Sequence, residues 1–107
     1  MIYELRIYEA APGKLPELNN RFANHTLGFF SRYDIKVVGF WTEDVGTSNN
    51  LVYILGFENW GDREKKWSAF MADPDWHRVK AESETEGLLV QKVHNKLLRP
   101  TDYSPLK

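Results

Sequence analysis

The chain has 107 residues, which fits one domain of common size, and carries 14 Lys and Arg against 15 Asp and Glu. These charges are interleaved and form no basic stripe, so nucleic acid is not an expected partner. The absence of cysteine excludes disulfides, thiolate catalysis and cysteine-ligated metals. No apolar run approaches the ~20 residues of a membrane span and no leader precedes the first predicted strand, so we expect a single cytoplasmic domain over residues 1–107.

The first third of the chain predicts a strand followed by a helix. Residues 2–9 alternate as a strand does, which places two sets of side chains on opposite faces: Tyr3, Leu5 and Ile7 on one, Glu4, Arg6 and Tyr8 on the other. Pro12-Gly13 predicts the turn that follows. Apolar residues then recur at three- and four-residue spacing, which predicts a helix over 15–32 with a face formed by Leu15, Leu18, Phe22, His25, Phe29 and Phe30.

A hairpin and an interrupted helix come next. Residues typical of strands cover 36–43 and 51–57, and the polar loop between them indicates an antiparallel hairpin. A second helix opens near Asn59 and stops at Asp73-Pro74, because proline disfavours the α region for the residue before it. It restarts there, since Asp73 is a good N-cap and proline suits the first helical position.

The last elements complete the predicted topology. The restarted helix ends near Gly87, a strand covers 88–98, and from about Pro100 the tail is expected to be extended. The order is βαββαβ. Right-handed crossovers then give an α+β, ferredoxin-like sandwich, in which a four-stranded antiparallel sheet of order 4-1-3-2 carries both helices on one face.

Neither face of this sheet is polar enough to lie in water. The strand over 51–57 carries Tyr53 and Leu55 on one face, and Val52 and Ile54 on the other. An antiparallel sheet with one wet face should alternate cleanly between apolar and polar residues. We therefore expect a second copy of the chain to cover the free face, which makes the protein a homodimer.

A set of short motifs runs along the chain: Tyr3-Glu4-Leu5-Arg6-Ile7-Tyr8 with Pro12-Gly13, Gly39-Phe40-Trp41-Thr42-Glu43, Asn50, Arg63 and Asp73-Pro74-Asp75-Trp76. Together they resemble the NIPSNAP family, from Ile2 to about Pro100. The resemblance implies the dimeric α+β barrel of the wider antibiotic-monooxygenase-like group. At the position on the third strand where the family usually has a histidine, this chain has Tyr53. The family implies no particular activity.

Three charged side chains form the first candidate site. Glu4 and Arg6 share a face of the first strand, and Glu43 ends the second. A buried charge is tolerated only when it is paired and hydrogen-bonded. We therefore expect one of two arrangements. The charges orient a ligand carboxylate or enol, with Arg6 as the bidentate donor, or they form an ion-pair network that fixes strand register or the dimer interface.

The second candidate site is a pocket between the first helix and the sheet, near His25, Phe29, Trp41 and Tyr53. An apolar lining with few polar groups is typical of small-molecule sites. Core packing is the alternative for the aromatic rings, and a satisfied, half-buried histidine is the alternative for His25. The three histidines lie on separate elements without ligand spacing, and no cofactor motif is present, so we expect neither a metal nor a cofactor.

Two classes of function fit these features. The first is a homodimeric small-molecule-binding or structural protein. The second is a cofactor-independent enzyme, monooxygenase-like or isomerase-like, that acts on a small activated carbon acid. In it, His25 or Tyr53 transfers a proton and Arg6 stabilises the oxyanion. The enzyme hypothesis rests on analogy of fold alone. Haem binding through His25 is a third hypothesis.

Overall fold

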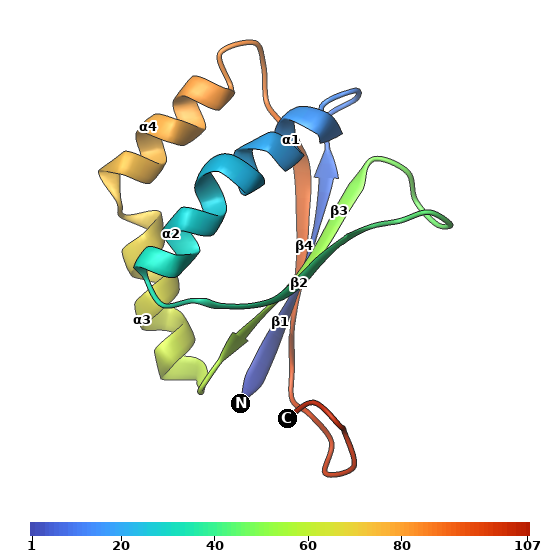
Figure 1. Ribbon diagram of the computed structural model, residues 1–107, viewed down its shortest axis with the longest axis vertical. Coiled ribbons are helices and arrows are strands. Elements are labelled where there is room, and N and C mark those ends of the chain that lie inside the picture. The colour runs from blue at the N-terminus through green and yellow to red at the C-terminus, as the bar shows by residue number, and fades with distance from the viewer.

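A four-stranded antiparallel sheet carries every helix of the molecule on one of its faces (Figure 1). This computed structural model describes all residues 1–107, and its strands lie in the order β2-β3-β1-β4. The predicted ferredoxin-like α+β fold and its strand order are confirmed. The bounds are Ile2–Ala10 for β1, Lys36–Thr42 for β2, Asn50–Phe57 for β3 and Val90–Leu98 for β4.

The helices form two arms over the sheet. The first arm joins α1 (Leu15–Arg21), a π-helical turn η1 (Phe22–Thr26) and α2 (Leu27–Arg32) without a break, and the second consists of α3 (Trp60–Met71) and α4 (Pro74–Ser83). The predicted break in the second arm is confirmed. The Asp73 carboxylate accepts a hydrogen bond of 2.8 Å from the Asp75 N–H, and Pro74 opens α4. This is the N-cap geometry that the sequence predicts.

The π-turn in the first arm changes which side chains face the sheet. The Leu27 N–H donates to the carbonyl of Phe22, five residues earlier, so this turn holds one residue more than an α-helical turn. His25, which α-helical spacing predicts for the buried face, is therefore exposed. A row of buried side chains instead recurs at every fourth residue along this arm: Leu18, Phe22, Thr26 and Phe30.

A bulge in β2 changes the facing of its aromatic side chains in the same way. Between Val37 and Gly39 the pairing with β3 shifts by one residue. Because a one-residue shift moves a side chain to the other face of a sheet, Phe40 lies opposite Tyr53 on the helix side and Trp41 lies on the free face. Trp41 and Tyr53, expected to share a pocket, are therefore on opposite faces of the sheet.

The core lies between the sheet and the two helical arms, and the ring of Tyr53 is at its centre. This side chain is fully buried. Its ring centroid lies 5.2 Å from that of Phe22, 6.2 Å from that of Phe30 and 5.0 Å from that of Phe40. Such offset and edge-on aromatic pairs add to the stabilisation from burial itself. The fixed ring positions the Tyr53 hydroxyl against strand β1.

No helix covers the free face of the sheet (Figure 1), which is largely apolar along β1, β2 and β3, whereas the register with β1 places Lys92, His94 and Lys96 of β4 on it. Two large side chains on it are well exposed, Trp41 at 50% and Leu98 at 42%. The registers of β1 with β3 and β4 place on this face the partly exposed side chains Leu5, Ile7, Val52 and Ile54.

The tail after β4 is turned rather than extended. The Ser104 N–H donates to the Thr101 carbonyl at 3.1 Å, which closes a tight turn. The two termini lie near each other at the same end of the sheet (Figure 1). None of the helices combines the length and the apolar character needed to cross a bilayer.

Candidate functional site

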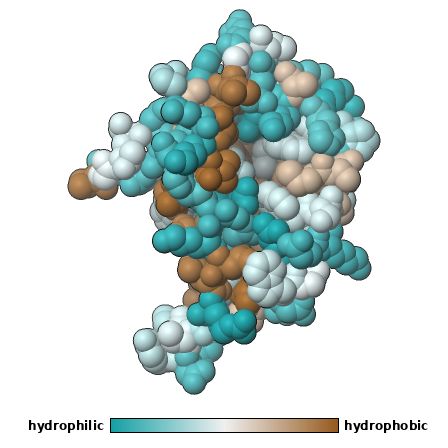
Figure 2. All heavy atoms as spheres, turned by 180° about the vertical axis from the view of Figure 1, so that it is seen from behind, coloured by the Kyte–Doolittle hydropathy of each residue, from teal (hydrophilic) through white to brown (hydrophobic).

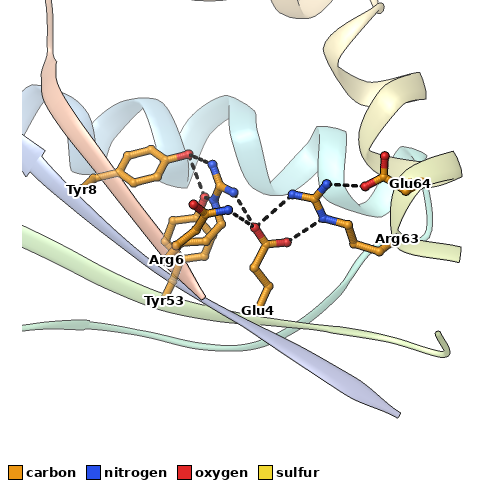
Figure 3. Close-up of polar contacts among 7 residues, drawn as sticks. Glu4, Arg6, Tyr8, Tyr53, Arg63 and Glu64 are labelled. Carbon is orange, nitrogen blue, oxygen red and sulfur yellow. Dashed lines mark hydrogen bonds and ion pairs between the residues drawn. The ribbon is translucent and has the colours of Figure 1, made fainter. Parts of the chain in front are cut away.

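The carboxylate of Glu4 is the centre of a buried polar network on the helix side of the sheet (Figure 3). Arg63 donates to it from Nε at 2.9 Å and from Nη2 at 3.1 Å. Arg6 donates from Nη1 at 2.7 Å, and Asn95 from Nδ2 at 3.0 Å. These four donors come from α3, β1 and β4, so a single side chain joins three elements.

Arg6 continues the network toward two tyrosines. Its Nε donates to the hydroxyl of Tyr53 at 2.8 Å, and its Nη2 donates to the hydroxyl of Tyr8 at 3.3 Å. The Tyr53 hydroxyl in turn donates to that of Tyr8 at 2.8 Å. The Tyr8 oxygen therefore accepts two hydrogen bonds, and its own proton has no acceptor within the chain (Figure 3).

The network keeps its charges ionised and the Tyr53 phenol neutral. Burial alone would raise the pKa of Glu4, but the hydrogen bonds from Arg63, Asn95 and Arg6 outweigh it and hold that pKa below its ordinary value of 4.5. Burial would also lower the pKa of Arg6, yet its tyrosine and Glu4 neighbours outweigh this effect and raise it. Burial raises the pKa of Tyr53 well above its ordinary value of 10.0.

Glu43, expected to join these charges, lies elsewhere. Its carboxylate accepts hydrogen bonds from the Asn50 side chain at 2.9 Å and from the Thr47 N–H at 3.3 Å. It therefore closes the loop between β2 and β3. Within the network, Arg63 and Asn95 are the partners of Glu4 and Arg6.

A cavity of about 350 Å³ lies beside this network, between the sheet and the helices. Trp67 from α3 and Trp76 from α4 line it together with Val93 from β4. The exposed side chains of Leu88 and Val93 also line it, so it opens to solvent along the last strand. On the side of the molecule turned away in Figure 1, apolar surface forms a broken vertical band between hydrophilic patches (Figure 2).

Three polar side chains of the cavity come from β1 and from the first helical arm, and the others come from α4, β4 and the segment between them. Arg6 and Tyr8 line it, so the unpaired proton of the Tyr8 hydroxyl is available to a ligand there. The guanidinium carbon of Arg6 lies 4.3 Å from the ring centroid of Trp67, a cation–π contact that fixes both side chains. Arg21 from α1 also lines the cavity.

The structure does not bring together His25, Phe29, Trp41 and Tyr53. His25 is exposed on the outer side of its helix, and Trp41 lies on the free face of the sheet. Phe29 is buried against Phe70 and Trp76, with ring centroids 6.0 and 5.7 Å apart. Tyr53 reaches the cavity only through its hydrogen bonds to Arg6 and Tyr8.

Two arginines of this region are absent from the sequence-based candidates, although the sequence carries a signal for both. Arg21 follows Leu18 by three residues on the apolar face of its helix, and Arg63 shares a helix face with Trp67 and Phe70. A charge on an otherwise apolar helix face needs a partner inside the fold, which marks it as a candidate. Asn95 carries no such signal, because its pairing with Glu4 depends on the register of β4.

A family model described as NIPSNAP matches residues 3–105 of the chain. Protein NipSnap from Drosophila melanogaster is 27% identical over 104 residues, which are 97% of this chain and 36% of the Drosophila protein. The chain therefore spans about a third of the length of that relative.

Solved structures share the whole fold. An uncharacterized NIPSNAP domain protein from Burkholderia xenovorans matches with a TM-score of 0.85 and 26% identity over 98% of this chain and 99% of its own. A NIPSNAP family protein with unknown function from Agrobacterium tumefaciens matches with a TM-score of 0.88 and 26% identity over 100% and 94% of the two chains. The likeness to MhuD with bound manganese protoporphyrin IX, at a TM-score of 0.59 and 15% identity over 94% of each chain, shows the fold alone.

Proposed function

The chain belongs to the NIPSNAP family, and from the geometry of its cavity we propose that it is a homodimeric protein that binds a small organic molecule between sheet and helices. The observation that carries the proposal is the lining. Two indole rings, Trp67 and Trp76, share one space with the guanidinium of Arg6 and the free donor of Tyr8. Apolar walls with a few fixed polar groups are typical of small-molecule sites.

The buried network supports this proposal because it holds the polar groups in place. Glu4 and Tyr53 accept hydrogen bonds of 2.7 and 2.8 Å from Arg6, so its guanidinium is held in one position before any ligand arrives. A binding group that is already ordered loses little conformational entropy when a ligand binds. The volume of about 350 Å³ lies within the range of known ligand sites.

The test is to fill the cavity from its rim. Val93 is exposed at the mouth, so Val93→Trp should block the space without disturbing the core. We expect compounds from a fragment library to shift the NMR resonances of Tyr8, Trp67 and Trp76 in the native protein and not in this variant. Lys65→Trp, at an exposed site on α3 outside the cavity, is the matched control. Fragment shifts that survive Val93→Trp would contradict the proposal.

The free face of the sheet supports the dimer in this proposal. The apolar part of this face, with well-exposed Trp41 and Leu98, is the kind of surface that a second copy of the chain would cover. The cytoplasmic location expected from the sequence is part of the same proposal, and cell fractionation tests it.

The alternative is a cofactor-independent enzyme, and one observation favours it. Tyr8 and Arg6 are hydrogen-bonded neighbours that both line the cavity, and together they would stabilise the enolate oxygen of an activated carbon acid. We expect such an enzyme to exchange the acidic hydrogens of acetylacetone with deuterium from solvent, followed by NMR. Tyr8→Phe should slow this exchange by at least about tenfold. Exchange no faster than in buffer would leave ligand binding as the function.

A further inference from the structure

Arg21 is a buried guanidinium without a carboxylate partner. The residue is 5% exposed, and its Nε has no hydrogen-bond partner. The one hydrogen bond that its side chain donates within the chain, from Nη1 to the hydroxyl of Ser83, measures 3.2 Å. Its guanidinium carbon lies 5.4 Å from the ring centroid of Trp76. A buried charge is normally paired and fully hydrogen-bonded, so Arg21 lacks the partner that such a charge usually has.

The other arginines packed into the fold differ from Arg21 in this respect. Arg6 and Arg63 share the carboxylate of Glu4. Burial lowers the pKa of Arg21, and the attraction of Glu84 opposes this without forming an ion pair. Arg21 therefore holds a charge that the protein itself does not neutralise.

The cavity beside Arg21 has an excess of positive charge. Besides Arg6, whose charge Glu4 balances, its lining includes Arg21, Lys80 and Lys92 against the single carboxylate of Glu84. Three cations against one anion favour a negatively charged ligand. Because Glu84 lies in the same lining, the excess is two positive charges, which accepts an anion of one or two negative charges.

We propose that Arg21 binds the carboxylate of the cavity's ligand, and that this ligand is a small aromatic carboxylate. The inference rests on the proposed function, since it takes the cavity to be a ligand site. A guanidinium binds a carboxylate through two parallel hydrogen bonds, and within the chain only Nη1 of Arg21 has a partner, the hydroxyl of Ser83. Trp67 and Trp76 then provide the walls against which an aromatic ring packs.

A matched pair of ligands tests the charge without any mutation. Naphthoate and naphthamide have the same ring system and nearly the same size, but only naphthoate carries a charge. By calorimetric titration we expect naphthoate to bind the native protein at least about tenfold more tightly, the usual effect of a hydrogen bond to a charged group. Naphthyl phosphate, with its second negative charge, suits the same excess of positive charge and so separates the two headgroups: tighter binding of the phosphate than of naphthoate would overturn the carboxylate assignment.

A variant then assigns the preference to Arg21. Arg21→Met keeps the length of the side chain and removes its charge, so the affinities for naphthoate and naphthamide should become equal within about twofold. Arg78→Met, at an exposed position on α4, should leave the preference unchanged. Where Arg21→Met does not fold, Arg21→Lys keeps the charge without the planar fork and should lose part of the preference.

The outcomes separate this inference from the proposed function. Equal affinities for the two compounds in the native protein, or a preference that persists in Arg21→Met, would overturn the role of Arg21 and leave the cavity as a ligand site. If neither naphthoate nor naphthamide binds, while other fragments still shift the NMR resonances of the cavity, only the carboxylate assignment would be overturned. Failure of every compound to reach the cavity would overturn both proposals.

Discussion

The guanidinium of Arg63 lies against the carboxylate of Glu4, and two hydrogen bonds of 2.9 and 3.1 Å join these residues, which are 59 positions apart in the sequence. The contact ties α3 to β1 on the helix side of the sheet. Arg6 and Asn95 bind the same carboxylate, so its charge is shared among three elements. Substitutions of Glu4 should therefore destabilise the whole domain and not only the strand that carries it.

Glu4→Gln should destabilise the fold at neutral pH by about 3 kcal/mol, because two buried guanidinium groups lose their anion. The folded-state pKa of Glu4 is lowered, so its contribution is fully present above its ordinary pKa of 4.5 and is lost as pH falls through the folded value. The difference in unfolding free energy between wild type and variant should therefore shrink below pH 4.5. Urea titrations at several pH values measure it. Glu64→Gln, at an exposed partner of Arg63, is the control. A difference that does not change with pH would contradict this account.

Arg6→Ala should also cost about 3 kcal/mol, at the low end of the range for breaking a buried pair. The loss of stability stays at the low end of this range because Arg63 and Asn95 continue to bind Glu4. Chemical denaturation of the variant beside Lys65→Ala, at an exposed position, gives the comparison. Equal unfolding free energies for the two variants would show that Arg6 is solvated.

Asp73→Ala should loosen the junction of three helices. Its carboxylate caps α4 through the Asp75 N–H and accepts hydrogen bonds from Tyr33 at 2.6 Å and Arg32 at 2.7 Å. We expect a melting temperature lowered by a few degrees, on the order of that for a lost N-cap, and faster amide exchange in the first turn of α4. Asp75→Ala removes a neighbouring carboxylate that caps nothing and should have less effect. Unchanged exchange in α4 would argue against the cap.

Light scattering at micromolar concentration should give twice the 12.5 kDa of one chain, because the free face of the sheet exposes large apolar side chains. Ile54→Glu places a charge in the middle of that face and should give a monomer. Val45→Glu, in a fully solvated loop position, should leave the mass unchanged. A native protein that scatters as a monomer would contradict the dimer.

Arg21→Met should stabilise the protein when no ligand is bound, by about 1 kcal/mol, since it replaces an unpaired buried charge with an apolar chain of similar length. Thermal denaturation of ligand-free protein measures it, with Arg78→Met as the exposed control. A clear loss of stability would show that the Arg21 charge already has a partner in the native fold.

Much of the fold could be predicted because its signals are local. The alternation of residues 2–9 places Glu4, Arg6 and Tyr8 on one face, and the structure has them there in one network. The step at Asp73-Pro74 breaks the helix for reasons that lie within a few residues. The strand order follows from the element order and from handedness.

The positions of single side chains were harder to predict, for two physical reasons. The bulge in β2 and the π-turn each insert one residue into a periodic element, and this moves Trp41 and His25 away from the faces that regular periodicity predicts. The partners of Glu4 depend on the packing of α3 and the register of β4, which bring Arg63 and Asn95 from 59 and 91 positions away.

The π-turn also constrains how many residues this helical segment contains, and it does so more strictly than it constrains which residues they are. It rotates α2 relative to α1 by one residue, about 100° around the helix axis, and so lets Arg21 and Phe30 both be buried. A related chain one residue shorter in this segment would keep a regular helix but turn one of these side chains toward solvent. We therefore expect related chains to differ in length in the loop 44–49 but not over residues 22–26. Related chains that keep the cavity should also keep the length of this helix.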